Sequence, residues 1–290
     1  MDCATRAEFA YAAHREKAVV MARIIAVIPA RMGSSRFPGK PLARINGVPM
    51  LGHVYFRSRM SPLLQEVFIA TCDAEIGAYA KRIGAPCIRT APTHERATDR
   101  TAEAVAILDR QAGTRADVVV MIQGDEPMLH PDMIDEAVAS LKQEPSIRVV
   151  NLMAPVSTDA EWHDPNTIKV VVDRRGDALY FSRAPIPFAK AQVDSASRFK
   201  QVCIMPFRRE FLSQFTALAP TALEAAESID MLRALEHGYR VRMVLTSRET
   251  HSVDTPADLA LVERHLAADP LVDRYRSLRH ADRSAAGTFA

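Results

Sequence analysis

A loop rich in glycine, serine and cations follows the first apolar run of the chain. Residues 28–42 read IPARMGSSRFPGKPL and carry three cations, Arg31, Arg36 and Lys40. Backbone N–H groups of such a loop can converge on phosphate oxygens, while Arg and Lys side chains neutralise several negative charges at once. The pattern favours a polyphosphate-binding loop over a surface loop with solvated cations. It is not a Walker A loop, because Pro41 stands where that motif needs Ser or Thr.

A second candidate lies where another apolar run ends in acidic residues. The segment VVVMIQGDEP, residues 118–127, places Asp125 directly after a strand-like stretch. A carboxylate there can hold Mg²⁺ against phosphates, because this ion keeps most of its waters and needs only one or two such ligands. The same residues are also typical of a turn or of a helix cap. Both interpretations of Asp125 stay open on sequence alone.

A third carboxylate, Asp254, lies in the segment HSVDTPADL. It precedes Thr255 and Pro256 at the start of a predicted helix, so an N-terminal cap is one role that its position suggests. A metal-binding role requires that the fold bring Asp254 beside Asp125, which is remote in the chain.

These residues must be positioned by elements that hydrophobic periodicity predicts. Strand-like runs occupy 24–29, 66–71, 86–89, 117–123 and 148–154. Helical spacing of apolar residues occupies 49–60, 74–83, 98–110 and 131–141. The alternation predicts an α/β fold with a doubly wound, mostly parallel sheet. Ligands of such sheets bind beyond the carboxyl ends of the strands, which is where the cationic loop and Asp125 fall.

The second half of the chain has a different pattern. Shorter strands are predicted at 168–172, 178–182 and 198–204, and the last two are separated by a turn containing APIPF. We expect these strands to form a smaller antiparallel appendage. A helix over 223–235, a strand over 239–245 and a helix over 256–265 complete the fold.

Bulk properties exclude several classes of protein. The 290 residues carry a net charge of only +2 with dispersed Lys and Arg, so nucleic acid is not the expected partner. The four cysteines form no C-x-x-C pair, which argues against a zinc site or a disulfide framework. Apolar runs fall far short of the roughly 20 residues that span a bilayer, so no membrane insertion is expected. We expect a cytoplasmic protein.

Four extended motifs occur together and in order. They are IPARMGSSRFPGKPL, VMIQGDEPML, NTIKVVVDRRGDALYFSRAPIPF and SVDTPADL. In sequence and separation they resemble the 3-deoxy-manno-octulosonate cytidylyltransferases, also called CMP-KDO synthetases. The resemblance covers residues 24–266. It implies a nucleotidyltransferase domain over 23–268, with an N-terminal extension at 1–22 and a C-terminal tail at 269–290.

The resemblance also implies an activity and its partners. A member of this family transfers CMP from CTP to an acidic sugar-like acceptor, usually works as a homodimer with Mg²⁺, and serves lipopolysaccharide biosynthesis. By this resemblance Arg31, Lys40 and Asp125 carry catalysis, and Asp125 and Asp254 bind the metal. The expected nucleotide contacts are Ala30, Arg31, Gly33, Ser34, Ser35, Lys40, Thr71, Asp73, Thr98, Arg100 and Gln123. The expected acceptor contacts are Arg100, Gln123, Tyr180, Ser182, Arg183, Gln201 and Asp230.

Departures from the family pattern fall mostly on the acceptor segments. The loop H-x-S-G-T-E-R, which lies near the base and ribose in that family, reads HERATDR here, so Arg96 and Ala97 replace Ser and Gly and make cytosine selectivity less secure. The stretch K-H-I-G-I-Y-G-Y-R reads KQVCIMPFR, and E-x-L-E-Q-L-R reads ESIDMLR. Replacing hydrogen-bonding side chains by Met and Cys removes discrimination for particular hydroxyl groups.

Three functions therefore remain open. The first is cytidylyl transfer to KDO or a related 2-keto-3-deoxy sugar acid. The second is cytidylyl transfer to a different small acid, such as a phosphonate. The third is a catalytically silent relative that binds nucleotide as a regulator, which retention of Arg31, Lys40, Asp125 and Asp254 disfavours. A nucleotide-sugar glycosyltransferase is disfavoured, because no Asp-x-Asp metal motif follows any of the predicted strands.

Overall fold

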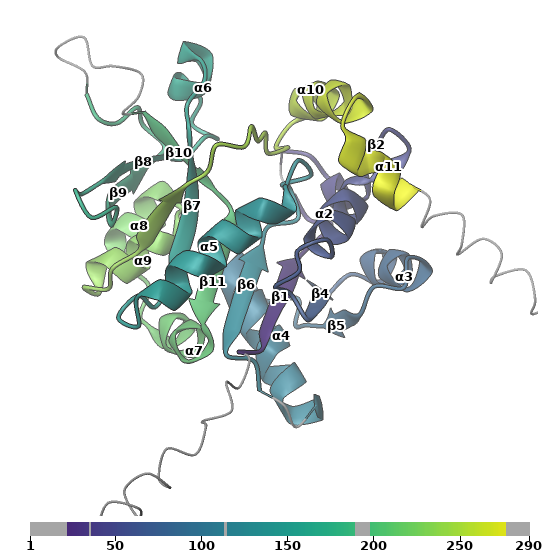
Figure 1. Ribbon diagram of the computed structural model, residues 1–290, viewed down its shortest axis with the longest axis horizontal. Coiled ribbons are helices and arrows are strands. Elements are labelled where there is room, and N and C mark those ends of the chain that lie inside the picture. Colours follow the sequence, from purple (N-terminus) through teal and green to yellow (C-terminus); the bar gives the residue numbers. More distant parts are fainter. Residues whose placement is uncertain (1–21, 35, 113–114, 189–197, 277–290) are drawn as a thin grey trace, which may run out of the picture.

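Two five-stranded sheets lie side by side in this protein and are surrounded by helices (Figure 1). The computed structural model describes residues 22–34, 36–112, 115–188 and 198–276. Ser35, nearly all of the expected extension at 1–22 and the end of the expected tail fall outside the described residues. Among the described helices, none combines the length and the apolar character that crossing a membrane demands.

The first sheet is the parallel sheet that the sequence predicts, with one antiparallel edge strand. Its order is β11 (Ile204–Arg208), β6 (Val118–Ile122), β1 (Ile24–Pro29), β4 (Glu66–Thr71), β5 (Cys87–Arg89). β1 pairs in parallel with both β4 and β6, and β11 pairs antiparallel with β6. The chain therefore adds strands first on one side of β1 and then on the other. The loops after β1 and β6 meet at this switch point, where ligands bind in open α/β sheets.

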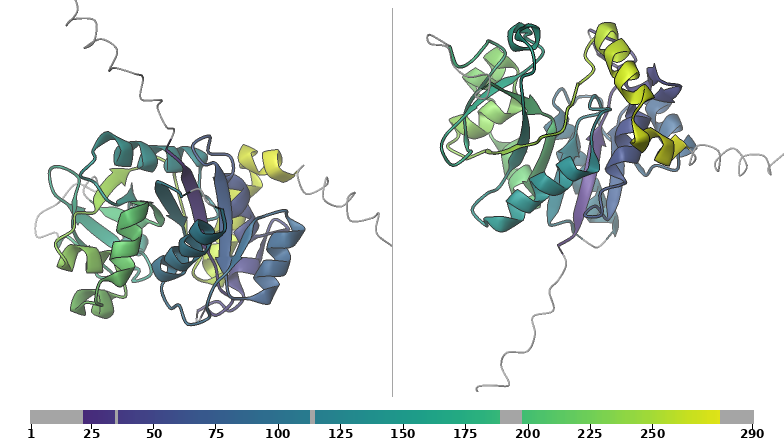
Figure 2. Two further views of the ribbon diagram at one scale, coloured as in Figure 1. Left: turned by 90° about the horizontal axis from the view of Figure 1, so that it is seen from below. Right: turned by 45° about the horizontal axis from the view of Figure 1, so that its top comes forward.

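Helices cover both faces of the first sheet (Figure 2). Alternate residues of β1 belong to different apolar clusters, with Ile24, Ala26 and Ile28 on one face and Ile25 and Val27 on the other. The first cluster includes side chains of α2 (Met50–Ser58), α3 (Ala74–Arg82), α5 (Pro131–Gln143), α10 (Pro256–Ala267) and α11 (Pro270–Arg276). The second includes side chains of α4 (Ala97–Ala112), α7 (Arg209–Ala217) and α9 (Asp230–Glu236). Burial on both faces explains why these strands are continuously apolar.

The second sheet is the predicted appendage, and it is larger than expected. Its order is β12 (Arg242–Leu245), β7 (Val150–Pro155), β10 (Phe199–Val202), β8 (Lys169–Val172), β9 (Ala178–Ser182). Only the β12–β7 pair is parallel. The strand at 148–154, which alternation assigned to the parallel sheet, is β7 and belongs here. An apolar sequence predicts a buried strand but not the strand with which it pairs. The local pattern therefore could not show to which sheet β7 belongs.

One predicted strand, 198–204, is two strands in different sheets. β10 belongs to the second sheet and β11 to the first, with Cys203 between them. The backbone of Cys203 is held by the loop after β6, since its carbonyl accepts from the Gln123 amide at 3.1 Å. Its N–H donates to Glu126 Oε1 at 3.2 Å. The chain thus passes from one sheet to the other at a point fixed by the β6 loop.

The predicted helix over 223–235 is broken at Ser228. This residue has a left-handed backbone, φ 54°, between α8 (Ala222–Glu227) and α9. A left-handed non-glycine residue cannot continue a right-handed helix. The break orients α9 so that Asp230 in its first turn faces Thr98 of α4.

Several short elements were not predicted. They are η1 (Lys40–Leu42), β2 (Arg44–Ile45), β3 (Val48–Pro49), α6 (Asp159–His163), α7 and α11. α11 begins after residue 268, where the sequence indicated a tail. Its Val272 and Tyr275 are buried in the cluster that contains α2, so packed structure continues past that boundary to Arg276.

Candidate active site

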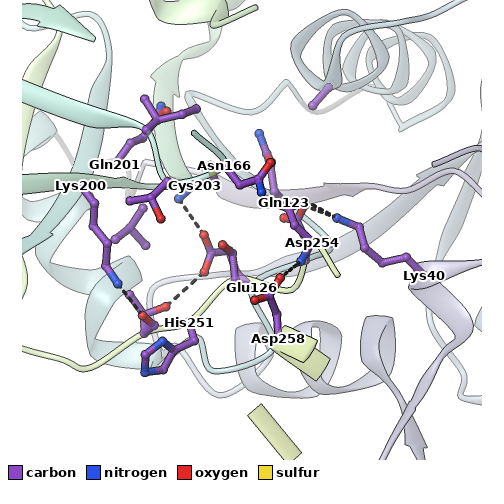
Figure 3. A pocket seen from close by; sticks show the side chains of 18 of the residues that line it. Lys40, Gln123, Glu126, Asn166, Lys200, Gln201, Cys203, His251, Asp254 and Asp258 are labelled. Carbon is purple, nitrogen blue, oxygen red and sulfur yellow. Dashed lines mark hydrogen bonds and ion pairs between the residues drawn. The ribbon is translucent and has the colours of Figure 1, made fainter. Parts of the chain in front are cut away.

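Lys40 joins two carboxylates that are remote in the sequence. Its Nζ lies 2.9 Å from Asp125 Oδ2 and 3.1 Å from Asp254 Oδ1. Burial lowers the pKa of Lys40, but the two carboxylates outweigh burial, and the pKa stands above its ordinary value. Lys40 is therefore a cation held between two anions, and Figure 3 shows it beside one of them, Asp254. This meets the condition on which a metal-binding role for Asp254 depended.

Neither acidic residue caps a helix. Thr255 is the N-cap of α10 and accepts from the Asp258 amide, while His130 caps α5. The carboxylates of Asp125 and Asp254 are left for Lys40 and, at Asp254, also for Arg36. The backbone holds them together, because the Val253 amide donates to the Asp125 carbonyl at 2.9 Å.

The loop after β1 is shaped by its own hydrogen bonds. The amides of Ser34 and Gly39 both donate to the Met32 carbonyl, at 3.0 and 3.1 Å. The Met32 amide donates to Asp73 Oδ2 at 2.8 Å. Gly39 has φ 75°, a conformation that glycine adopts without steric cost. The loop is thus fixed before a ligand binds, and part of the amide set expected for phosphate serves the loop itself.

Two arginines of the loop are placed differently. Arg36 is paired, since its guanidinium donates to Asp254 Oδ1 at 3.0 Å and also to Asn166 Oδ1. Arg31 is exposed, and it forms no hydrogen bond or ion pair within the described part of the chain. All donors of Arg31 are therefore available to a ligand.

A cavity of about 900 Å³ opens between the two sheets at the ends of β1 and β6. Its walls come from both sheets, from the loop after β1 and from the segment between β12 and α10. The predicted residues that line it are Ala30, Arg31, Gly33, Ser34, Lys40, Arg100, Gln123, Asp125, Arg183, Gln201, Asp230 and Asp254. One cavity thus collects both the expected nucleotide contacts and the expected acceptor contacts.

Five predicted site residues do not line this cavity. Thr71 is fully buried, and Asp73 binds the Met32 amide. Thr98 is buried and donates to Asp230 Oδ2 at 2.7 Å. Tyr180 and Ser182 both hydrogen-bond to Glu227. These side chains support the walls rather than form them, a distinction that motif matching cannot make.

The cations and acids at the second-sheet end of the cavity are already paired. Arg183 donates to backbone carbonyls, including Glu227 O at 2.6 Å and Pro165 O at 2.9 Å. Asp230 accepts from Thr98 and lies 3.5 Å from Arg96 Nη1. Burial raises the pKa of Asp230, and the Thr98 bond and Arg96 oppose that rise. The charged side chains at this end of the cavity are therefore already hydrogen-bonded to other protein groups.

Residues of β10 are paired in the same way. Gln201 donates to Asn151 Oδ1 at 2.5 Å. Lys200 is buried, pairs with Glu161 and donates to the Thr250 carbonyl at 2.8 Å. Lys200 therefore ties the second sheet to the segment that leads to Asp254.

Glu126 is a cavity residue that sequence reasoning passed over. It is 3 % exposed, and it accepts from the Cys203 amide at 3.2 Å and from Thr250 Oγ1 at 3.1 Å. Burial raises its pKa to about 7, and Asp125 adds to the shift. The sequence pattern singled out the adjacent Asp125 as a metal ligand. Nothing in the sequence indicated that the neighbouring Glu126 is buried.

The Asp125–Asp254 pair fits a divalent cation. Its two oxygens converge on one ammonium nitrogen, so a cation of higher charge can replace that nitrogen. Mg²⁺ is typically bound by one or two carboxylates together with substrate phosphates and water. The phosphate candidates, Arg31 and Lys40, lie in the same cavity wall.

Comparisons with known proteins place the chain in a family. Residues 25–247 match the family model described as cytidylyltransferase. The chain is 43% identical over 255 residues to a 3-deoxy-manno-octulosonate cytidylyltransferase of Geobacter metallireducens, covering 84% of this chain and 98% of that protein. It is 45% identical over 251 residues to the enzyme of the same name from Syntrophotalea carbinolica, with the same coverage.

Two solved structures are similar to this chain in fold. A CMP:2-keto-3-deoxy-manno-octonic acid synthetase complexed with CTP superposes with a TM-score of 0.76 at 38% identity, covering 85% of this chain and 99% of that one. A cytidylyltransferase from Leptospira borgpetersenii has a TM-score of 0.58 at 15% identity, covering 89% and 96%. The second likeness shows a shared fold alone.

Proposed function

Because this chain belongs to the cytidylyltransferase family, we propose that it transfers CMP from CTP to 3-deoxy-manno-octulosonate or a closely related 2-keto-3-deoxy sugar acid and releases pyrophosphate. The observation that carries the proposal is the Lys40 bridge between Asp125 and Asp254 at the edge of the preformed loop. The cavity of about 900 Å³ lies near the upper end of the ~300–1,000 Å³ that ligand pockets typically occupy.

The triphosphate is bound by the cations of the loop. Arg31 is uncommitted among the described residues and provides a planar fork for phosphate oxygens. Lys40 holds the two carboxylates together in the free protein. With a divalent cation on the two carboxylates, the ammonium group of Lys40 would be free to contact the phosphates.

Asp125 and Asp254 are the residues that would hold the metal, and Mg²⁺ is the ion we propose. When bound, the ion would supply charge neutralisation at the phosphates.

The transfer requires no covalent intermediate on the protein. The acceptor's anomeric hydroxyl oxygen forms a bond to the α-phosphorus, the bond between that phosphorus and the bridging oxygen breaks, and pyrophosphate leaves with the electron pair. The hydroxyl proton is released to solvent. Cys203 is no candidate nucleophile, because burial raises the pKa of its thiol and Glu126 adds to the shift. Positioning and electrostatic stabilisation therefore account for the catalysis.

The acceptor end supports a sugar acid related to KDO as a second possibility. Arg96 lines the cavity, donates to Ser228 Oγ at 2.9 Å and lies near Asp230. Its guanidinium adds bulk and charge at a position where the family pattern has Ser. Arg96 would therefore suit an acceptor that differs from KDO in the part that lies against this side chain.

The test is pyrophosphate release with Mg²⁺, measured for each of the four nucleoside triphosphates. The acceptor panel contains KDO, amino-KDO, sialic-type acids and phosphonates. Release with CTP alone, and fastest with KDO, supports the proposal. Release with a phosphonate and not with KDO would reassign the acceptor, while saturable CTP binding without any release would support a regulatory nucleotide-binding protein. The homodimer and the cytoplasmic location remain predictions.

A further inference from the structure

Three potential metal ligands meet on the cavity wall away from the Lys40 bridge. They are Glu249, His251 and His265, and their ligand atoms all lie within 4.8 Å of one another. Glu249 and His251 belong to the extended segment between β12 and α10, and His265 lies in the last turn of α10. All three line the cavity, and Figure 3 draws His251 among its side chains.

The contacts among these residues leave ligand positions open. His251 Nε2 lies 3.1 Å from Glu249 Oε1, and the two imidazole rings have centroids 5.0 Å apart at 36°. His265 is half-buried, and its side chain forms no hydrogen bond to any described residue. The hydrogen bond to His251 lowers the pKa of Glu249, so its carboxylate is ionised at neutral pH, as a metal ligand must be.

We propose that Glu249, His251 and His265 form a binding site for a divalent transition metal such as Zn²⁺, separate from the carboxylate pair at Asp125 and Asp254. Two imidazoles and one carboxylate form a ligand set that zinc uses with a fourth position left to water or an anion. Imidazole ligands favour zinc, cobalt or copper, whereas Mg²⁺ prefers carboxylates and water. Small side-chain rotations bring the three atoms to the spacing of about 3.3–3.5 Å that bonds of about 2.0–2.1 Å require.

The site joins two elements that position Asp254. The segment that carries His251 runs as an extended thread from β12 to α10 (Figure 1). It also holds Thr250, whose carbonyl accepts from Lys200, and Val253, whose amide binds Asp125. A metal bound to His251 and His265 fixes this thread against α10.

The test is a titration of the full chain with Co²⁺, after removal of any affinity tag and of metal by chelation. Millimolar Mg²⁺ is present throughout to occupy the carboxylate pair. Co²⁺ bound by nitrogen and oxygen in a four-coordinate site gives visible absorption, and Zn²⁺ should displace it. The variants are His265→Ala, His251→Ala and Glu249→Gln. The control is His237→Ala, an exposed histidine bonded only to the Ala219 carbonyl.

We expect one Co²⁺ per chain in the natural sequence and in His237→Ala. His265→Ala and His251→Ala should weaken binding by at least ~100-fold, because losing even an outer partner of a ligand typically costs 10–100-fold. Zn²⁺ should also raise the melting temperature of the natural protein but not of His265→Ala. Absence of saturable binding in the natural protein, or equal affinity in His265→Ala, would overturn the proposal. Should His251→Ala fail to fold, His265→Gln decides the question, because its helix position tolerates glutamine.

Discussion

The two ends of the cavity treat charge in opposite ways. At the expected phosphate end Arg31 is uncommitted within the described residues, while Lys40 and Arg36 pair with carboxylates that another cation could take over. At the acceptor end Arg183, Lys200 and Asp230 are already bonded to protein groups. A polyphosphate needs strong, general charge neutralisation, whereas a sugar acid is selected by positioned hydrogen bonds. The contrast predicts that the first end binds by charge and the second by shape and hydrogen bonding.

The largest expected effect comes from removing a charge at the phosphate end. Asp125→Asn should lower turnover by at least about 10²–10³-fold, the range typical for loss of one electrostatic group in an active site. Pyrophosphate release at saturating CTP and acceptor measures it. The melting temperature should stay near that of Asp132→Asn, a control for an exposed carboxylate on α5. Near-normal turnover in Asp125→Asn would remove this residue from the metal site.

Replacing the bridging cation should weaken catalysis and create a metal-dependent stability. Lys40→Ala leaves two carboxylates facing each other, so the metal-free protein should melt at a lower temperature. Mg²⁺ should restore stability more than in the natural protein, and kcat/KM for CTP should fall by about 10²-fold. Melting curves with and without Mg²⁺ are compared with those of Lys142→Ala, in the last turn of α5. Equal Mg²⁺ shifts in the two variants would contradict the exchange of Lys40 for a metal.

Glu126 connects the two ends and should make stability depend on pH. Its folded-state pKa of about 7 lies above its value in an unfolded chain, so the folded protein binds more protons between those values. Stability should therefore fall by about 1–3 kcal/mol as pH rises from ~5 to ~8. In Glu126→Gln this loss should disappear.

Urea unfolding across that pH range without metal provides the measurement for Glu126. Glu75→Gln, at an exposed position in the first turn of α3, is the matched control and should keep the natural pH dependence. A Glu126→Gln protein whose stability still falls with pH as in the natural chain would show that another group titrates.

The smallest effect is expected at the acceptor end, and it should be selective. Arg96→Ser removes a guanidinium that donates to Ser228 and lies near Asp230. The KM for the acceptor should change by about tenfold, equivalent to ~1.4 kcal/mol, while the KM for CTP changes less than ~2-fold. Steady-state kinetics with each substrate varied in turn separates the two. Equal changes in both constants would show that the two ends are not independent.

Sequence reasoning succeeded where the signal is local. β1 and β4 have the predicted bounds, and the loop after β1 lines the cavity. The meeting of Asp125 and Asp254 was stated as a condition, and the structure meets it. Strand-end position and the Gly-rich loop depend on a few adjacent residues, so a single sequence contains that information.

The rest depends on contacts between distant segments. The assignment of β7 to the second sheet is set by its pairing with β10 and β12, which no local periodicity encodes. The predicted acceptor residues Tyr180 and Ser182 instead hydrogen-bond to Glu227, the last residue of α8. Which of several polar residues faces a cavity is a tertiary property, and motif matching registers only their presence.

The passage of the chain from β10 to β11 has a consequence for dissecting this protein. β11 pairs with the edge of β6 in the first sheet. Its residues, 204–208, come after most strands of the second sheet in the sequence. A fragment ending near residue 155 would contain the other four strands of the first sheet but expose the backbone groups of β6. Unpaired strand edges recruit further chains. We expect such a fragment to aggregate, so halves of this enzyme are poor candidates for separate expression.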